Sequence, residues 1–237
     1  MADCDIVKDG GIVYLGAMEI SYLGHACFKL RGKSITVVAD PFAEKAGKFP
    51  KDVKADIITV SHDHFDHNAT GLVQEPDGGR KPFVITDPGE YEIGGVSVVG
   101  VPTWHDDKKG QERGRNTVYV IEMEGVRLAH CGDLGHKLAQ DELDEMGPID
   151  VLFVPVGGLF TLDAKVAAEV VKQVDPWVVI PMHYQQPELD QKTFGQLTGV
   201  EKFLAELGKG EMETVSKYVI SAERMPEELQ IVVMARR

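Results

Sequence analysis

The sequence predicts a mixed α/β (α+β) domain in which two β-sheets are covered by helices. Short β-branched runs that end in Gly, Pro, Asp or Asn dominate the first half of the chain, and this punctuation is typical of strands. In the second half, amphipathic helical periodicity alternates with nearly continuous apolar runs, as in a β-α-β unit. The 237 residues, 43% of them hydrophobic, can bury a full core, and we predict one domain over residues 1–237.

The strands of the first half are short and closely spaced. Two pairs are predicted to form hairpins, one across Arg31-Gly32-Lys33 and the other across Glu124-Gly125. The predicted strands cover residues 12–15, 18–23, 26–30, 34–39, 56–60, 83–86, 96–101, 117–122 and 126–130.

The second half contains the helices. Residues 164–174 place Val166, Val170 and Val174 on one face, which predicts a helix that packs on a sheet. The other predicted elements are helices over 138–146 and 197–207 and strands over 149–154, 177–181 and 230–234.

Charge and composition exclude several classes of protein. With 25 Lys+Arg against 38 Asp+Glu, the net charge is −13. Nucleic-acid phosphate and anionic lipid repel such a chain, and no basic run exceeds Lys108-Lys109, so we predict no nucleic acid and no membrane as partner. The N-terminus lacks the regions of a signal peptide, and three widely spaced cysteines (Cys4, Cys27 and Cys131) indicate reduced thiols, so we expect a cytoplasmic protein. Whether it forms a homo-oligomer stays open.

One motif carries the chemistry. After the strand predicted over 56–60 the chain reads Ser61-His62-Asp63-His64-Phe65-Asp66-His67, a HxHxDH pattern. With this composition it is expected by chance on the order of 0.001 times, so it is a strong signal. Imidazole nitrogens and carboxylate oxygens are ligands that zinc and related divalent ions prefer. The motif predicts a metal site at the carboxyl end of a buried strand.

The spacing within the motif indicates two ions. In an extended segment residues i and i+2 share a face, so His62 and His64 can converge on one ion. Asp66 and His67, on a tighter turn, can reach a second ion beside it. Each ion still needs ligands from the ends of other strands, and the candidates are His105, Asp133 and His183.

This ordered set resembles the metallo-β-lactamase superfamily. Within it, the chain resembles a branch of metal-dependent hydrolases related to ascorbate-phosphate lactonases and, more distantly, to N-acyl phosphatidylethanolamine phospholipase D. The resemblance covers about Ile12 to the C-terminus and implies a four-layer αββα sandwich with the site at one edge. It is specific for fold and metal but not for substrate. Besides the ligands, the matching stretches are Leu23-Gly24-His25-Ala26-Cys27-Phe28, Ala39-Asp40-Pro41, Arg113-Gly114-Arg115-Asn116-Thr117, His130-Cys131-Gly132-Asp133-Leu134-Gly135-His136 and Pro181-Met182-His183-Tyr184.

The resemblance also implies which residue holds which ion. The first ion would be bound by His62, His64 and His105, the second by Asp66, His67 and His183, and Asp133 would bridge both. Zinc is the default ion, and manganese, iron and nickel accept the same ligands.

Two cations about 3.5–4 Å apart lower the pKa of a bridging water toward neutrality, which supplies hydroxide without a protein nucleophile. One cation would also stabilise the negative charge that develops on a carbonyl or phosphoryl oxygen. The superfamily suggests that Asp66 passes a proton to the leaving group, which makes Asp66 and Asp133 the expected catalytic carboxylates. We therefore predict a dinuclear hydrolase that cleaves a small, anionic ester, lactone or phosphodiester.

Several neighbouring residues have two interpretations each. The resemblance suggests that Asp40 fixes the tautomer of a ligand imidazole, whereas Asp before Pro is also a common turn former. His25 either bonds a buried backbone group or binds substrate at the site mouth. Arg113, Arg115 and Asn116 form either a solvated loop or an anion clamp, and Tyr184 either donates a hydrogen bond to substrate or packs. His130, His136 and Cys131 are interpreted as structural.

Other functions of the same fold are weighed against hydrolysis. A metal-binding sensor or partner subunit without turnover is the main alternative, although a complete ligand set argues against a decayed site. An iron oxidoreductase, an RNA-processing enzyme and an antibiotic hydrolase fit less well. An iron oxidoreductase would require the flavo-diiron pattern. An RNA-processing enzyme would require RNA-clamping domains, and an antibiotic hydrolase would require an export signal.

Overall fold

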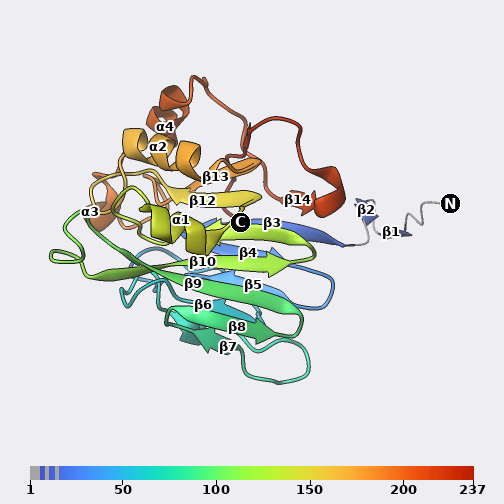
Figure 1. Cartoon of the computed structure of the whole chain (residues 1–237). Coiled ribbons are helices and arrows are strands. Elements are labelled where there is room, and N and C mark those ends of the chain that lie inside the picture. The colour runs from blue at the N-terminus through green and yellow to red at the C-terminus, as the bar shows by residue number, and fades with distance from the viewer. Residues whose placement is uncertain (1–5, 9–10, 14–15) are drawn as a thin grey trace.

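Two β-sheets packed face to face form the centre of the computed structural model, which describes residues 6–8, 11–13 and 16–237 (Figure 1). The larger sheet contains, in spatial order, β15 (Gln230–Ile231), β13 (Val178–Met182), β12 (Val151–Pro155), β11 (Val126–His130), β10 (Arg115–Met123), β9 (Val96–Trp104) and β8 (Gly89–Ile93). The smaller sheet contains β14 (Tyr218–Ser221), β3 (Ala17–Gly24), β4 (Cys27–Arg31), β5 (Thr36–Ala39), β6 (Ile57–Thr59) and β7 (Phe83–Ile85). A separate hairpin pairs β1 (Ile6–Lys8) with β2 (Gly11–Val13).

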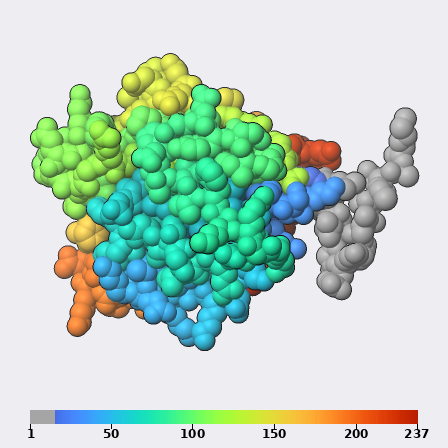
Figure 2. Space-filling view, turned by 90° about the horizontal axis from the view of Figure 1, so that it is seen from below, coloured from blue at the N-terminus to red at the C-terminus, as the bar shows by residue number. Residues whose placement is uncertain are grey.

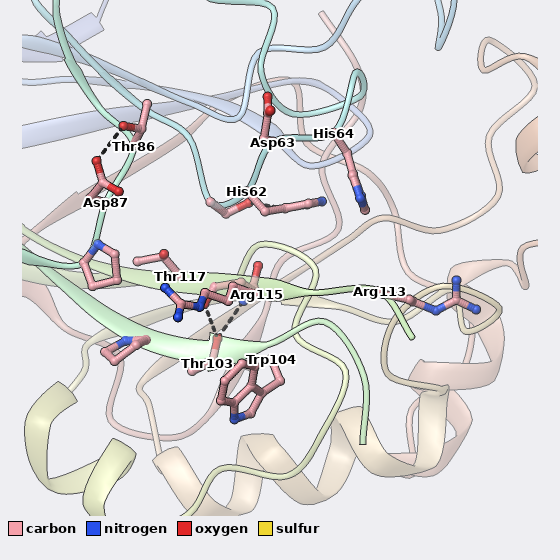
Figure 3. A pocket seen from close by; sticks show the side chains of 14 residues that line it. His62, Asp63, His64, Thr86, Asp87, Thr103, Trp104, Arg113, Arg115 and Thr117 are labelled. Atoms are coloured by element: carbon pink, nitrogen blue, oxygen red, sulfur yellow. Dashed lines mark hydrogen bonds between the residues drawn. The ribbon is translucent and has the colours of Figure 1, made fainter. Parts of the chain in front are cut away.

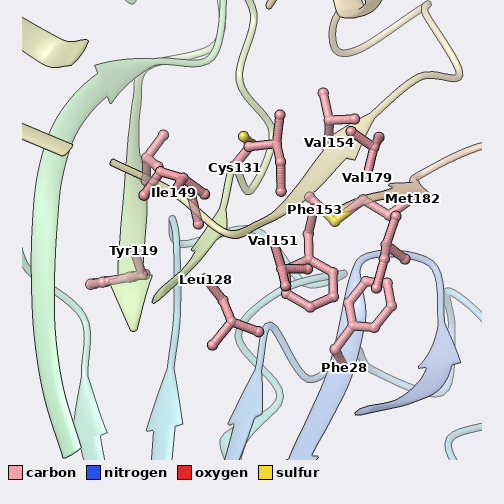
Figure 4. Close-up of a cluster of buried hydrophobic side chains, with 14 of the residues drawn as sticks. Phe28, Tyr119, Leu128, Cys131, Ile149, Val151, Phe153, Val154, Val179 and Met182 are labelled. Carbon is pink, nitrogen blue, oxygen red and sulfur yellow. The ribbon is translucent and has the colours of Figure 1, made fainter. Parts of the chain in front are cut away.

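Alternating side chains separate two cores. Val37 of β5 and Ile57 of β6 lie in the cluster between the sheets, which continues to the helices beyond the larger sheet. The next residues, Val38 and Ile58, lie in a second cluster on the outer face of the smaller sheet. Figure 4 shows part of the inner cluster, in which Phe28 of the smaller sheet meets Phe153 of the larger one, with ring centroids 4.5 Å apart. Strands buried on both faces explain the nearly continuous apolar runs in the sequence.

Helices cover the outer face of the larger sheet. These are α1 (Gln140–Met146), α2 (Ala164–Val174) and α4 (Val200–Glu206). In Figure 1, α2 and α4 lie together above β12 and β13, whereas α1 lies below β12. Asp163 caps the N-terminus of α2, because its carboxylate accepts a hydrogen bond from the backbone N–H of Val166. It joins β12 to β13, and the two strands are parallel, so the predicted β-α-β unit is confirmed.

The outer face of the smaller sheet has a thinner cover. Its apolar side chains pack against irregular segments around Phe42 and Leu189, with only the short helix α3 (Gln191–Phe194) contributing Phe194. The 3₁₀ turns η1 (Thr70–Leu72) and η2 (Ala222–Arg224) complete the elements. The predicted αββα sandwich is therefore confirmed, with one helical layer much smaller than the other.

Some predicted elements differ from the observed ones. Both predicted hairpins form, as β4–β5 and β10–β11. The predicted helices at 138–146 and 197–207 begin later, at Gln140 and Val200, and the last strand is shorter than predicted. The strands β8 and β14 were not predicted, because each lies at a sheet edge and is defined by its pairing with a neighbour. Tyr14 and Leu15, at the end of a predicted strand, and Cys4 lie outside the described residues.

Strand direction brings several chain segments to one end of the molecule. In the smaller sheet β5 and β6 are parallel, and in the larger sheet β11, β12 and β13 are parallel. The segment after β9 and the segment around α3 project at the same end (Figures 1 and 2). No helix in the described part of the chain is long and apolar enough to cross a membrane.

Candidate metal centre

The predicted ligands meet where strands of both sheets end. His62 follows β6 of the smaller sheet, whereas His105, Asp133 and His183 follow β9, β11 and β13 of the larger one. Their potential ligand atoms form three overlapping groups, each with atoms within 4.8 Å of one another. The groups are His62 with His64 and His105, then His62 with His67 and Asp133, and finally His25 with Asp66, His67 and His183. The structure thus brings together all seven residues that the sequence suggested as ligands.

Asp133 lies at the centre of the cluster. Its carboxylate oxygens are 3.1 Å from Nε2 of His67, 3.1 Å from Nε2 of His105 and 3.3 Å from Nε2 of His183. Nε2 of His62 is slightly farther away, at 3.8 Å. One carboxylate therefore faces imidazoles from both groups that the sequence assigned to separate ions.

Asn116 anchors Asp133 from behind. Its Oδ1 accepts a hydrogen bond from the backbone N–H of Asp133 at 2.9 Å. Its Nδ2 donates to Oγ1 of Thr103 at 2.8 Å and to the carbonyl of Cys131 at 2.9 Å. Because Asn116 is buried and fully engaged, it supports the cluster and is not free to clamp an anion.

Asp40 orients two of the histidines. Its Oδ2 accepts hydrogen bonds from Nδ1 of His67 at 2.8 Å and from Oγ of Ser61 at 2.6 Å. Ser61 Oγ in turn lies 2.9 Å from Nδ1 of His62. These hydrogen bonds place the proton of both imidazoles, His62 and His67, on Nδ1 and direct the Nε2 lone pairs into the cluster. Burial raises the pKa of Asp40, but the hydrogen bond from His67 and nearby imidazoles outweigh it and leave that pKa lowered. The role of Ser61 was missed by sequence reasoning, because a serine before a histidine motif carries no distinguishing signal.

Buried polar atoms without hydrogen-bond partners show that the cluster fits a metal. Within the described residues, Nε2 of His62, His67 and His183 and Oδ1 of Asp133 have no such partner. Leaving a buried polar atom unpaired costs about 1–3 kcal/mol, and imidazole and carboxylate atoms aimed at one another are the donor set of a divalent cation. Burial lowers the pKa of His62 to about 3, so this imidazole is neutral and its Nε2 is ready to bind an ion.

Two residues with open interpretations lie away from the site mouth. His25 is completely buried, and its Nε2 lies 3.0 Å from Oδ2 of Asp66. Tyr184 belongs to the apolar core, where burial raises its pKa to about 12. Neither lines the two cavities described next, so the structure gives no support to direct substrate contact by either.

A pocket of about 590 Å³ opens beside His62 and His64. Figure 3 shows Arg115 and Thr117 of β10 across this pocket from His62. Arg115 is exposed and stands opposite Trp104 in the β9–β10 register. Within the described residues its guanidinium forms no hydrogen bond or ion pair, so it is available to an anion in the pocket.

A smaller cavity of about 340 Å³ lies on the other side of Arg113, with His105 in its wall. The Arg113 guanidinium donates to the carbonyl of Leu159 at 3.1 Å and lies 5.4 Å from the ring centre of Phe160. Arg113 therefore ties two loops together, and the two arginines of the predicted clamp differ in their availability.

Asp106 holds the loop that carries these arginines. Its two oxygens accept hydrogen bonds from four backbone N–H groups at 2.8–3.0 Å. Burial raises the pKa of Asp106, but these donors outweigh that effect and bring it to about 2. The donors belong to Lys108, Gly110, Glu112 and Arg113. Asp106 was not singled out in the sequence, because its role depends on how the loop folds back.

The surplus histidines have structural partners. Nε2 of His130 lies 2.7 Å from the carbonyl of Ala26, and its Nδ1 accepts from the backbone N–H of Gly132. Nε2 of His136 accepts from the backbone N–H of Trp104 at 3.1 Å. Cys131 is buried, and burial raises its thiol pKa to about 12, which disfavours a nucleophilic role.

Known proteins share both the fold and the sequence pattern. Residues 19–183 match the sequence profile of the β-lactamase superfamily domain. A metal-dependent hydrolase of Thermococcus onnurineus is 32% identical over 82% of this chain and 98% of its own length. A structure described as a candidate zinc-dependent hydrolase of the metallo-β-lactamase superfamily, from Thermotoga maritima, superposes with a TM-score of 0.72. It is 38% identical, over 92% of this chain and 98% of its own. A metallo hydrolase of Ignicoccus hospitalis, 19% identical over 86% of this chain and 99% of its own, shares the fold with a TM-score of 0.64.

The αββα sandwich with a His/Asp cluster at its strand ends is that of the metallo-β-lactamase fold, and the relatives that share its sequence are metal-dependent hydrolases. The chain belongs to the metallo-β-lactamase superfamily, among its metal-dependent hydrolases.

Proposed function

We propose that the protein is a dinuclear metal hydrolase that cleaves a small, anionic ester, lactone or phosphodiester. The observation that carries this proposal is the position of Asp133 between two groups of imidazoles. A single ion would leave one group of buried nitrogens without a partner. Two ions that share the Asp133 carboxylate would satisfy both groups.

The assignment follows the groups in the structure. His62, His64 and His105 would hold the first ion, Asp66, His67 and His183 the second, and Asp133 both. When bound, two divalent cations supply Lewis-acid charge and lower the pKa of water at the site toward neutrality. Zinc suits this nitrogen and oxygen donor set, and manganese, iron and nickel are its competitors.

Asp66 is suited to move a proton. Burial raises its pKa, but the neighbouring His67 and the hydrogen bond from His25 outweigh burial and lower it. The carboxylate is therefore ionised at neutral pH, where it can accept a proton from the attacking water and return it to the leaving group.

Arg115 supports an anionic substrate. Its free guanidinium lines the same pocket as His62 and His64, in a chain whose net charge is −13. A guanidinium can hold a phosphate or carboxylate with two parallel hydrogen bonds. The anionic part of the substrate would thus lie over β10, with its scissile bond toward the histidines.

Turnover of chromogenic substrates tests the proposal. The protein, reconstituted with zinc or manganese, is assayed with a chromogenic phosphodiester and a chromogenic lactone. We expect one substrate to be hydrolysed and Asp133→Ala to lower kcat/KM at least about 100-fold, because a shared ligand is lost. Asp141→Ala, at an exposed position of α1, is the matched control and should retain full activity.

The two substrates also separate the bond types. Preference for the diester would place the enzyme among phosphodiesterases, and preference for the lactone would indicate acyl chemistry. Full metal loading without turnover of either substrate would instead favour the metal-binding sensor.

A further inference from the structure

His25 contacts Asp66, His67 and His183, the three residues proposed to hold the second ion. It lies in the turn between β3 and β4, is completely buried, and has a left-handed backbone with φ of 57°. His183, after β13 of the other sheet, also has a left-handed backbone, with φ of 52°. Two such turns facing each other are uncommon for residues other than glycine and point to a specific role.

The imidazole of His25 holds Asp66. Its Nε2 lies 3.0 Å from Oδ2 of Asp66, and because that carboxylate is an acceptor, the proton resides on Nε2. One lone-pair direction of Oδ2 is therefore occupied, which restricts how the carboxylate can rotate. The remaining lone pairs of Asp66 are left for an ion.

The backbone of His25 holds His183. Its carbonyl accepts a hydrogen bond from the backbone N–H of His183 at 2.9 Å and a second one from Oη of Tyr22 at 2.7 Å. The two imidazole rings also pack against each other, with centroids 4.1 Å apart. One residue thus connects ligands that come from different sheets.

We propose that His25 is a positioning residue at the second metal site: its Nε2–H aims the Asp66 carboxylate, while its backbone carbonyl seats His183. The inference rests on the proposed dinuclear function. The competing role, in which His25 is itself a ligand, is disfavoured because its Nε2 would have to release Asp66. Its Nδ1 has no partner within the described residues, and its ring packs against Phe194, with centroids 4.8 Å apart.

Two substitutions separate these roles. In His25→Gln the amide nitrogen sits near the place of Nε2 and can still donate to Asp66, whereas in His25→Asn it is too short to reach. Asn tolerates the left-handed backbone well, so His25→Asn preserves the turn. Both variants lose the ring packing against His183 and Phe194, so the difference between them isolates the contact with Asp66. The matched control is His130→Gln, because His130 is also a buried histidine that bonds to a backbone carbonyl.

The readout is zinc per chain, measured by elemental analysis after dialysis against a graded chelator, together with thermal melting of the metal-free proteins. We expect wild type, His25→Gln and His130→Gln to retain two ions. His25→Asn should bind its second ion about 10–100-fold more weakly, as for loss of a residue that orients a metal ligand. Its metal-free melting temperature should match that of wild type.

Other outcomes would overturn the inference. If both His25 variants lose the second ion while the metal-free proteins melt normally, His25 is a ligand. If both variants bind two ions as tightly as wild type, the contact with Asp66 has no positioning role. If both lower metal-free melting in parallel with metal loss, His25 acts through packing. A wild-type protein that binds a single ion would refute the dinuclear proposal, a result that needs no His25 variant.

Discussion

Ser61 transmits the charge of Asp40 to His62 through a single hydroxyl. The hydroxyl donates to Asp40 Oδ2, so its oxygen can accept from Nδ1 of His62. Ser61→Ala removes this link and frees the His62 tautomer. We expect zinc affinity to fall about 10-fold or more, measured by competition with a chromogenic chelator. Ser34→Ala, at an exposed position, should leave the affinity unchanged, and an equal loss in both variants would contradict the role of Ser61.

Arg115 should determine substrate charge preference. Arg115→Ala removes the free guanidinium from the pocket beside His62. We expect KM for an anionic substrate to rise about 10-fold, equivalent to about 1.4 kcal/mol, while KM for a neutral analogue stays nearly constant. Steady-state kinetics on the matched pair checks this expectation. Arg115→Lys should restore part of the difference, and equal effects on both substrates would exclude an anion-binding role.

The loop between β9 and β10 depends on one carboxylate. Oδ1 of Asp106 accepts from the backbone N–H groups of Lys108 and Gly110, and Oδ2 accepts from those of Glu112 and Arg113. Asp106→Asn replaces one oxygen by an N–H₂ donor and removes one of these pairs. We expect backbone amide exchange in residues 108–113 to accelerate at least about 10-fold, since each of the two lost bonds to a charged acceptor contributes about 1.5 kcal/mol or more. Hydrogen exchange measures this, with exposed Asp107→Asn as the unchanged control.

The same loop should respond to acid. The pKa of Asp106 in the folded protein is about 2, below its ordinary value of 3.8. A lowered pKa means that the carboxylate stabilises the folded loop fully above pH 3.8, and this contribution disappears as the pH falls from 3.8 through about 2. Amide exchange in residues 108–113, measured at pH 5 and pH 3 and corrected for intrinsic rates, should show weaker protection at pH 3. Asp106→Asn should lack this dependence.

At the scale of the whole molecule, the metal centre joins the two sheets. Asp66 and His67 follow β6 of the smaller sheet, whereas Asp133 and His183 belong to the larger one. An ion held by both sides binds only the folded sandwich and therefore stabilises it by mass action. At a free ion concentration 100 times Kd, one site contributes about 2.7 kcal/mol, which corresponds to a rise in Tm of roughly 5–10 °C for a chain of this size.

Removal of the ions by a chelator tests this coupling. We expect calorimetry to show a lower Tm for the stripped protein, restored by added zinc. In Asp133→Ala the chelator should shift Tm much less, because the shared ligand is absent. An identical shift in wild type and Asp133→Ala would mean that the stabilising ion lies elsewhere.

The sequence by itself determined the fold class, the ligand candidates and the positions of most strands. Local spacing carries this information, since HxHxDH after a buried strand and apolar runs of fixed period are properties of neighbouring residues. The helix 164–174 was predicted at its observed bounds because its apolar period is strong. His105, Asp133 and His183 could be chosen because each follows a predicted strand.

Only the tertiary structure decided how these residues support one another. His25 meets Asp66, and Asn116 meets Asp133, across contacts between distant parts of the chain that local spacing does not encode. The Arg113 guanidinium is engaged because Leu159 and Phe160 lie within its reach, which the sequence does not reveal. The edge strands β8 and β14 likewise exist through pairing with β9 and β3. Local pattern specifies which groups are present, and packing between distant segments decides which of them touch.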